Sequence, residues 1–203
     1  MHKITDNEYN NNIVIMDNAL PSKICESIIS RFECEKDVEP TSHSIHKDVV
    51  VANIFKTLGI VIREENKKWI DIFDILHESV NKNLKIYSEK TNFSKSKYGN
   101  IYFQYAHIQK ILKGGFYKPH IDNFTSSNDN EYQRIITFIW YLNDVENGGE
   151  THFLRTGLKI TPKIGRLAMF PSKAPFYHEG LCTQEDKYII STWLEVKKSF
   201  HYK

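Results

Sequence analysis

The sequence has few of the features that mark secreted or membrane-spanning proteins. Its 203 residues include only three cysteines, Cys25, Cys34 and Cys182, and their spacing fits neither a metal site nor a disulfide framework. Reduced thiols in an intracellular protein are the simplest explanation. No apolar run approaches the roughly 20 residues that a membrane helix needs. Residues 1–12 lack the apolar core of a signal peptide. We therefore expect a cytoplasmic protein with no membrane partner.

An excess of one charge is also missing. The chain has 27 lysines and arginines against 25 acidic residues, a net charge of +2, so nothing indicates a nucleic-acid partner. The basic tail, residues 197–203, is short and is interpreted as a solvated terminus. The length suits one domain with a sizeable core. Because we find no internal repeat or long linker, we expect a single domain over residues 1–203, and the sequence gives no signal for its oligomeric state.

The first part of the chain, residues 1–99, has the pattern of a supporting region. An apolar run at residues 13–16 predicts a short strand, and a helix should begin near Ser22, a plausible N-cap. Residues 33–48 are polar and predict a loop. Its two histidines, His43 and His46, could be ligands three residues apart, but an exposed loop is the simpler interpretation. Residues 49–51 could form another short strand.

The longest predicted helix covers residues 63–88. Its apolar residues recur in steps of three and four, which is the spacing of one helix face. These residues are Trp69, Phe73, Leu76, Val80, Leu84 and Tyr87. The helix should therefore lie on a sheet and bury this stripe. His77 stands beside the stripe, where we expect a structural role.

From residue 100 the pattern changes to β-strands. Residues 101–112 are long, aromatic and β-prone, Lys113 to Gly115 predict a turn, and residues 116–122 predict a strand. Short strand candidates follow at 151–154, 158–160, 166–170 and 174–178. Many short strands parted by glycine and proline, after a helical start, predict a mainly β sandwich or jelly roll with helices packed outside.

A histidine and an aspartate, both common metal ligands, stand two residues apart at the end of the predicted strand 116–122. On an extended strand His120 and Asp122 point to the same face, so both can reach one metal ion. His178, 56 residues after Asp122, is the best third ligand. Two histidines and one carboxylate are typical of non-haem Fe(II) oxygenases. The triad alone is weak evidence in a chain with nine histidines, and His152 is a rival third ligand.

A lysine nine residues beyond His178 strengthens this interpretation. Residues 186–194 predict a strand in which Lys187, Ile189 and Trp193 share one face, together with Ser191. A cation that faces inward needs an anionic partner, because burying it alone is costly. The distal carboxylate of a dicarboxylic cosubstrate would be such a partner. The alternatives are a surface lysine on an edge strand and, for Trp193, a plain core tryptophan.

The segment between the two halves of the triad is less regular. Residues 123–133 are polar and have no periodicity, which is consistent with a lid over the substrate or with a simple surface hairpin. A strand should follow from Arg134 to Leu142. Tyr141 shares its inward face with Thr137, whereas Arg134 has the other parity unless a bulge intervenes.

Taken in order, these residues carry a family resemblance over roughly residues 100–197. The signposts are Gly114, Tyr117 and Pro119; His120-Ile121-Asp122; Arg134 and Thr137; Tyr141-Leu142-Asn143-Asp144-Val145; Gly148-Gly149-Glu150-Thr151; Phe153, Pro162, Lys163, Gly165 and Phe170; and His178, Lys187 and Trp193. A weaker echo lies at residues 13–21. In order and spacing the chain resembles the prolyl 4-hydroxylase-like branch of the iron(II)/2-oxoglutarate dioxygenases.

The resemblance implies a fold and a set of ligands. The fold would be a double-stranded β-helix, a cupin-like jelly roll, over residues 100–197 with the N-terminal helices on one sheet. Fe(II) would be held by the three triad residues and would act with 2-oxoglutarate and dioxygen, and ascorbate would be the reductant. Lys187 would pair with the distal carboxylate of 2-oxoglutarate, Tyr141 would donate a hydrogen bond to it, and Trp193 would form an apolar wall.

The implied reaction is hydroxylation of an unactivated C–H bond, with a prolyl residue of a peptide or protein as the first choice. A free amino acid or other small metabolite is the alternative substrate, and a non-enzymatic cupin-like metal or ligand binder is the second alternative. Arg134 and Tyr117 are the candidate substrate contacts. The carboxylate of Asp122 argues against a halogenating relative. Where many family members carry a tyrosine, Ile111 and Leu112 stand here, which weakens the prolyl assignment.

Overall fold

The computed structural model describes residues 5–40, 54–123 and 131–198. The helices are α1 (Asp6–Asn11), α2 (Ser22–Glu33), α3 (Ile70–Lys90) and the 3-10 turn η1 (Lys95–Lys97). The strands are β1 (Val14–Met16), β2 (Glu39–Pro40), β3 (Ile54–Ile62), β4 (Ile101–Tyr102), β5 (Ala106–His120), β6 (Tyr132–Tyr141), β7 (Thr151–Phe153), β8 (Leu158–Ile160), β9 (Leu167–Pro171), β10 (His178–Gly180) and β11 (Lys187–Lys197).

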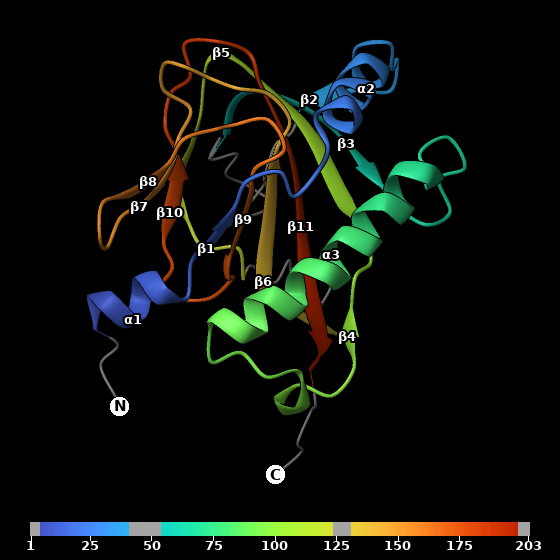
Figure 1. Cartoon of the computed structure of the whole chain (residues 1–203). Coiled ribbons are helices and arrows are strands. Elements are labelled where there is room, and N and C mark those ends of the chain that lie inside the picture. The colour runs from blue at the N-terminus through green and yellow to red at the C-terminus, as the bar shows by residue number, and fades with distance from the viewer. Residues whose placement is uncertain (1–4, 41–53, 124–130, 199–203) are drawn as a thin grey trace, which may run out of the picture.

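The strands form one curled antiparallel sheet. Its main order is β1-β9-β6-β11-β5-β10-β7-β8, with β2 and β3 added beside β5 and β4 added beside β11. The first half of β5 pairs with β11, whereas its last residues pair with β10. Strand β5 therefore passes from the large part of the sheet to the smaller part that holds β7, β8 and β10, as Figure 1 shows. The expected mainly β, jelly-roll architecture with outer helices is confirmed.

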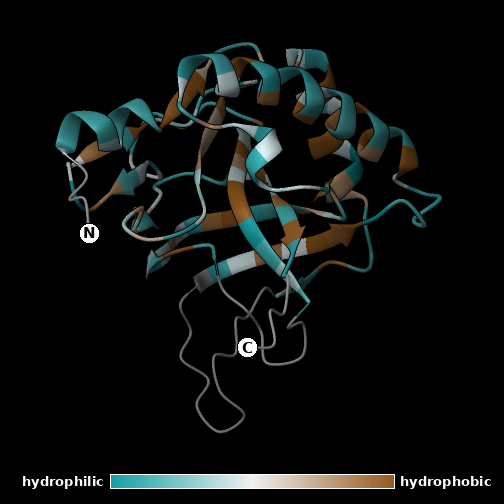
Figure 2. Cartoon of the chain, turned by 90° about the horizontal axis from the view of Figure 1, so that it is seen from below, coloured by the Kyte–Doolittle hydropathy of each residue, from teal (hydrophilic) through white to brown (hydrophobic). Residues whose placement is uncertain are grey.

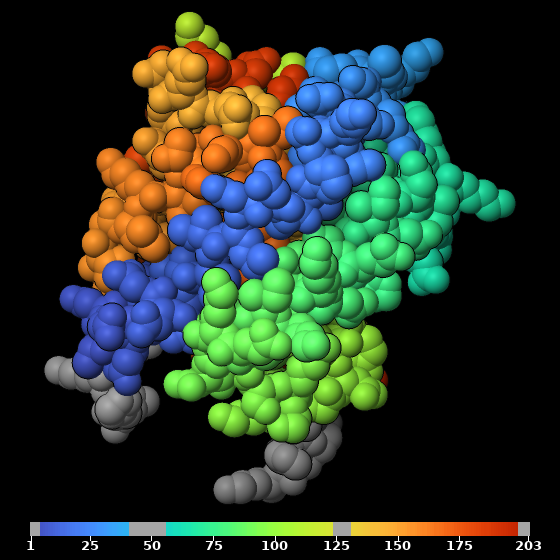
Figure 3. Space-filling view, viewed as in Figure 1, coloured from blue at the N-terminus to red at the C-terminus, as the bar shows by residue number. Residues whose placement is uncertain are grey.

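Two N-terminal helices cover one face of the sheet. Helix α3 crosses in front of β6 and β11, with α2 beside it (Figures 1 and 3). Their buried stripes, which include Phe32, Leu76 and Leu84, meet Ile190 and Leu194 of β11 in one apolar cluster. Hydrophilic residues are prominent on the outer side of these helices in Figure 2. The predicted packing of the long helix on a sheet is therefore correct.

The opposite face of the sheet lines the inside of the curl. A second apolar cluster there joins Ile139, Phe153, Phe170 and Ile189, closed at one end by Tyr9 of α1. The alternation predicted for the last strand holds, because odd-numbered residues of β11 turn inward and Ile190 and Leu194 turn toward the helices. The inner face is where polar side chains become available for chemistry.

Strand β5 contradicts the predicted turn at Lys113 to Gly115. The strand continues through this segment to His120, but its pairing with β3 jumps from Ile111 to Phe116, which is a bulge. Gly114 has φ +81°, a conformation that side chains other than glycine rarely adopt. Local sequence cannot separate a bulge from a turn here, because both use glycine. The bulge bends β5 toward β10 and so delivers His120 to the second half of the sheet.

Several other boundaries differ from the sequence-based ones. The cap of α2 is Pro21, with no side-chain hydrogen bond, so the prediction of Ser22 as N-cap is wrong. Helix α3 begins only at Ile70, because Trp69 is its N-cap residue and donates its indole N–H to Glu35 at 3.1 Å. Helix α1 and strand β3 were not foreseen. The predicted strand at residues 174–178 begins only at His178.

Some expectations fall outside the described residues. These are the histidines His43 and His46, the strand at residues 49–51 and most of the polar segment 123–133. His77 stacks on Phe103, with ring centroids 5.6 Å apart, in agreement with a structural role. Within the described parts of the chain, no helix is both long and apolar enough to cross a bilayer.

Candidate metal and cosubstrate site

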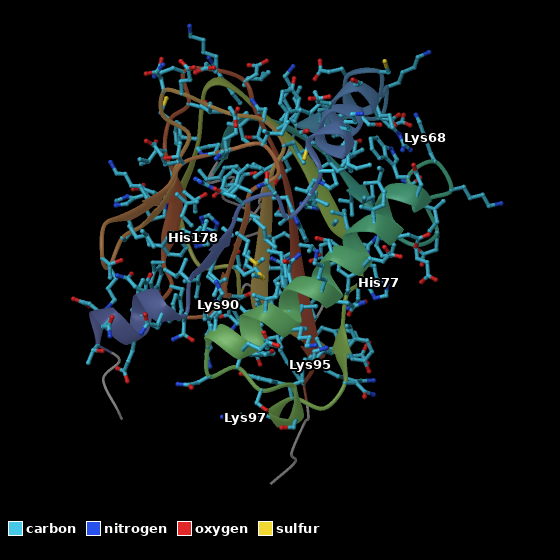
Figure 4. The ribbon with its side chains drawn as sticks, viewed as in Figure 1. Lys68, His77, Lys90, Lys95, Lys97 and His178 are labelled. Atoms are coloured by element: carbon cyan, nitrogen blue, oxygen red, sulfur yellow. The ribbon has the colours of Figure 1, made fainter. Side chains whose placement is uncertain are left out.

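The three residues of the predicted triad meet at one point. His120 ends β5, Asp122 follows it, and His178 opens β10 directly opposite His120 in the strand register; Figure 4 labels His178 on its strand. Asp122 lies between the rings, with its carboxylate oxygens 3.4 Å from Nε2 of His120 and 3.8 Å from Nε2 of His178. One potential ligand atom from each residue lies within 4.8 Å of the others. This spacing suits a single bound metal ion.

Backbone carbonyls orient both imidazoles. Nδ1 of His120 lies 2.7 Å from the carbonyl oxygen of Lys118, and Nδ1 of His178 lies 3.2 Å from that of Phe176. Because a carbonyl only accepts, each Nδ1 carries the proton and donates it. Nε2 of each ring is then left with a lone pair directed at the centre of the triad. Such outer contacts fix the tautomer and direction of metal-binding histidines.

Asp122 is held by a side chain of β6, which is itself bonded to a residue that follows β9. The hydroxyl of Thr137 on β6 donates to Oδ2 of Asp122 at 2.7 Å, and Ser172 lies 2.9 Å from the Thr137 hydroxyl. Asp122 and Thr137 are both buried. The sequence predicts that Thr137 lies on the inward face but not that it bonds to Asp122. Ser172 was missed because it follows the end of β9.

The electrostatics of Asp122 and His178 favour the protonation states that metal ligands need. Burial alone would raise the pKa of Asp122, but the facing His178 and the hydrogen bonds from His120 and Thr137 hold it well below its usual range. Burial lowers the pKa of His178 to about 4. For His120 burial acts in the same direction, but its hydrogen bond with Asp122 outweighs it and raises the pKa. At neutral pH the site thus presents a carboxylate beside an unprotonated His178.

Lys187 lies on the inner face, at the first position of β11, and is only 5% exposed. Its Nζ donates to the carbonyl oxygen of Gly149 at 2.6 Å. Burial lowers the pKa of this amine to about 8, and the charge of Glu150 acts against that shift. An ammonium group has three donors, and one neutral acceptor leaves much of its charge uncompensated. The surroundings of Lys187 therefore fit the carboxylate of a small dicarboxylate.

Of the two residues predicted to lie near Lys187, Tyr141 does and Trp193 does not. Tyr141 lies close, with Nζ of Lys187 5.6 Å from its ring centroid, and its hydroxyl lies 2.6 Å from that of Thr151. Trp193, six residues along the same strand, is 7% exposed and packs against Tyr105 and His107. Tyr141 and Lys187 therefore lie together, whereas Trp193 lies at the other end of the inner face.

Both predicted substrate contacts, Arg134 and Tyr117, interact with other side chains of the protein. A bulge in the β6–β11 pairing, between Leu194 and Glu195, puts Arg134 on the inner face, where its guanidinium carbon lies 3.7 Å from the ring centroid of Trp193. The hydroxyl of Tyr117 accepts a hydrogen bond from the amide of Gln109, which in turn accepts from Ser191. Gln109 was missed, although its odd position on β5 placed it on the inward face.

His152, the rival third ligand, lies away from the triad. It pairs with Glu179 across β7 and β10, and the two side chains are 2.8 Å apart. Its neighbour Phe153 is part of the inner cluster, so His152 points to the outer face. Among the described residues the only group with metal-ligand spacing is the triad of His120, Asp122 and His178.

A separate hollow lies beside the inner face. This cavity of about 440 Å³ is bounded by His107 and Val61, which pair with each other across β5 and β3. Its lining also carries Asp37, Glu39 and the Glu35–Lys68 ion pair. Because His107 also contacts Trp193, the cavity and the inner face share a wall.

Comparison with known proteins places this arrangement in a class. Residues 103–195 match the family model of the 2OG-Fe(II) oxygenase superfamily, and this stretch contains the triad and Lys187. The chain is therefore similar to members of that superfamily, and its likeness is to the prolyl 4-hydroxylase-like kind, as the sequence motifs indicated.

The similar curated proteins are subunits of prolyl 4-hydroxylases. The human prolyl 4-hydroxylase subunit alpha-3 is 35% identical over 74 residues, which is 34% of this chain and 13% of the human protein. The chicken subunit alpha-2 is 45% identical over 56 residues, 26% of this chain and 10% of that protein. The matched segments therefore span only a small part of these relatives.

Solved structures of prolyl hydroxylases share the whole fold. A collagen prolyl hydroxylase from Paramecium bursaria Chlorella virus-1, solved with 2OG, has a TM-score of 0.68 at 20% identity and covers 91% of this chain and 96% of its own. A prolyl hydroxylase from Trichoplax adhaerens, solved with a hypoxia inducible factor peptide, has a TM-score of 0.70 at 20% identity, with coverages of 93% and 86%. At this identity the likeness concerns the fold.

Proposed function

We propose that this protein is an Fe(II)- and 2-oxoglutarate-dependent oxygenase that hydroxylates an unactivated C–H bond, with a prolyl residue of a peptide or protein as its substrate. The observation that carries the proposal is that two features lie on the same inner face of the sheet. One is the triad of His120, Asp122 and His178, whose ligand atoms converge. The other is the buried and under-neutralised Lys187 on the same inner face.

The residues present fit both groups. His120 and His178 would bind Fe(II) through Nε2 and Asp122 through its carboxylate, a set that suits non-haem Fe(II) oxygenases. Lys187 would bind the distal carboxylate of 2-oxoglutarate through a charge-assisted hydrogen bond. Bound Fe(II), 2-oxoglutarate and dioxygen supply the oxidation, in which the cosubstrate becomes succinate and carbon dioxide and the substrate gains a hydroxyl group. Ascorbate is the expected reductant.

The protein's own residues supply position and a dry surface. Thr137 holds the carboxylate of Asp122 in place, and the carbonyls of Lys118 and Phe176 hold the imidazoles. Tyr141 and Ile189 close the inner face around Lys187 and are buried. Exclusion of water strengthens the pairing of Lys187 with an anion, because the local dielectric is low.

A peptide or protein substrate is favoured over a free amino acid. At the Trp193 end of the inner face, His107 contacts Trp193 and also lines the 440 Å³ cavity. Such an extended surface accommodates residues on either side of the oxidised one. The Trichoplax prolyl hydroxylase of the same fold was solved with a peptide, which supports the same choice. A small-metabolite hydroxylase remains the second candidate, favoured if free amino acids stimulate turnover.

Succinate formation and iron binding test the proposal together. The wild-type protein with Fe(II), ascorbate and 2-oxoglutarate should form succinate, and a prolyl peptide should raise the rate. Asp122→Ala should abolish both iron binding, measured by calorimetry, and succinate formation. His152→Ala is the matched control, since it removes an imidazole from the outer face and should change neither. Undiminished iron affinity in Asp122→Ala would rule out the assigned ligand set.

A further inference from the structure

Two hydrogen bonds and one cation–π contact lead from the backbone of Asp122 out to an arginine on the surface. The carbonyl oxygen of Asp122 accepts a hydrogen bond from Nη1 of Arg134 at 3.2 Å. Nη2 of Arg134 donates to the hydroxyl of Tyr105. The guanidinium carbon of Arg63 in turn lies 4.9 Å from the ring centroid of Tyr105. Arg63 is thus two side chains away from a metal-ligand candidate, at the rim of the inner face.

Arg134 and Arg63 differ in how many of their N–H donors are available to a ligand. Arg134 is largely buried, stacks on Trp193, and directs its donors at Asp122, Tyr105 and Glu195. Arg63 is exposed, directly after β3, and no carboxylate of the described residues pairs with it. Its guanidinium keeps five N–H donors in a flat fork that suits a carboxylate. Arg63 is therefore the better placed of the two to bind an incoming group.

The cavity next to Arg63 carries negative charge. Val61, two residues before Arg63, belongs to the lining of the cavity that carries Asp37 and Glu39 together with the Glu35–Lys68 ion pair. Asp37 and Glu39 therefore repel a negatively charged group on the side of the cavity, whereas Arg63 attracts it. Opposed charges of this kind orient a partner as well as attract it.

We propose that Arg63 is a specificity-determining residue that binds a carboxylate of the peptide substrate, close in sequence to the residue that is oxidised. The inference rests on the proposed peptide hydroxylase function. The Tyr105 ring holds the guanidinium through a cation–π contact, so less side-chain freedom is lost when the carboxylate binds. The substrate class is an acidic peptide, in which an aspartate or glutamate flanks the target residue.

A panel of peptides tests the role of Arg63. Each peptide contains one proline and differs at a single position, within three residues on either side, where it carries Asp, Asn or Lys. The readout is kcat/KM for peptide-stimulated succinate formation. Wild-type protein should prefer Asp over Asn by roughly tenfold at one or more positions, which corresponds to about 1.4 kcal/mol. Arg63→Glu should reverse the order and prefer Lys over Asp at the same positions.

Two controls separate recognition from a structural role. Lys67→Glu makes the same change of charge at an exposed residue four positions along, which has no ion pair in the described part of the chain, and should keep the wild-type preference. Tyr105→Phe keeps the aromatic ring under Arg63 and should keep the preference, whereas Tyr105→Leu should weaken it. A merely structural Arg63 would lower activity on all peptides alike and would not reverse their order.

Three results would overturn the inference. They are a wild-type protein without preference for Asp at any position, an Arg63→Glu variant with the wild-type order, and a complete lack of turnover of peptides. In each of these cases succinate formation from 2-oxoglutarate without a peptide shows whether the oxygenase function itself stands. Its loss would show that the proposed function has failed, which is a separate outcome.

Discussion

At the scale of single residues, the site depends on groups that are buried without full compensation. Asp122 is ionised inside the protein because His178, His120 and Thr137 surround it. Lys187 has the opposite problem, because the hydrogen bond that its Nζ donates within the described parts of the chain goes to the neutral carbonyl of Gly149. Burial disfavours the charged amine of Lys187, and the charge of Glu150 offsets this only in part. An anionic cosubstrate offsets the remainder.

This arrangement predicts a pH dependence of 2-oxoglutarate binding. The pKa of Lys187 is lowered to about 8 by burial, while both carboxyl groups of the ligand are ionised at any pH above neutral. Only the protonated amine pairs with the carboxylate, so the affinity should be constant below pH 8. Above pH 8 it should fall by up to tenfold per pH unit. Calorimetric titration between pH 6.5 and 9.5, with Fe(II) replaced by a redox-inert divalent ion, measures this.

Lys187→Arg and Lys187→Ala serve as comparisons in the same titration. The guanidinium stays charged throughout this range, so Lys187→Arg should bind more weakly, because the fork needs more room, but without the fall above pH 8. Lys187→Ala should lose on the order of 2–5 kcal/mol of binding. An affinity for 2-oxoglutarate in wild-type protein that is flat to pH 9.5 would contradict the assigned role.

At the scale of elements, glycines in positive-φ conformations place the site residues. Gly148 and Gly149, with φ +77° and +73°, turn the chain so that the carbonyl of Gly149 meets Lys187. A Cβ on Gly148 would come 2.1 Å from the carbonyl oxygen of Cys182. The connection between β6 and β7 is therefore both a turn and part of the cosubstrate site.

Two glycine substitutions should separate strain from crowding. Gly157→Ala meets no atom within 4 Å and has φ +69°, so it should cost only the left-handed conformation, about 1–2 kcal/mol of unfolding free energy. Gly148→Ala should cost a further 1–3 kcal/mol, because the backbone must shift, and it should also weaken 2-oxoglutarate binding. Urea unfolding and ligand titration of both variants measure this. Equal losses in the two variants would show that the turn has room to relax.

Alternation along strands made much of the site predictable. It put Lys187 on the buried face with Trp193, which agrees with the structure. It also put Asp122 on one face of a strand with His120; the two side chains do meet, although β5 ends at His120 and Asp122 lies beyond it. The bulges at Gly114 and in β6 could not be predicted, because pairing between distant strands decides them. The bulge in β6 changed the face of Arg134.

Other features were missed for different reasons. Helix α1 has a capping box in which Thr5 and Glu8 bond reciprocally, a signal that the sequence does carry. The partner of Lys187 is the backbone carbonyl of Gly149, and a backbone acceptor cannot be recognised from the residue type. The late start of α3 at Ile70 arises because the Trp69 indole bonds to Glu35, 34 residues away in the chain, and no local pattern contains that contact.

At the scale of the whole molecule, the sheet separates two apolar clusters, one that joins the helices to the sheet and one that surrounds the site. The outer cluster joins α2 and α3 to the sheet and lies on the opposite side from the triad. The inner cluster surrounds the site, and Phe170 within it packs its ring 4.8 Å from that of His178 in an edge-to-face arrangement. Damage to the two clusters should therefore have different consequences.

One substitution in each cluster tests this division. Leu76 on α3 and Phe170 on β9 are both fully buried, so Leu76→Ala should cost about 2–5 kcal/mol and Phe170→Ala about 3–5 kcal/mol of unfolding free energy. Well below the melting temperature, Leu76→Ala should still bind metal as the wild type does. Phe170→Ala should bind it more weakly, because His178 loses a wall that restrains its ring. Since both variants lose packing, a general loosening of the fold would weaken metal binding in both. Weaker binding in Phe170→Ala alone follows only if the inner cluster is what holds the ligands in place.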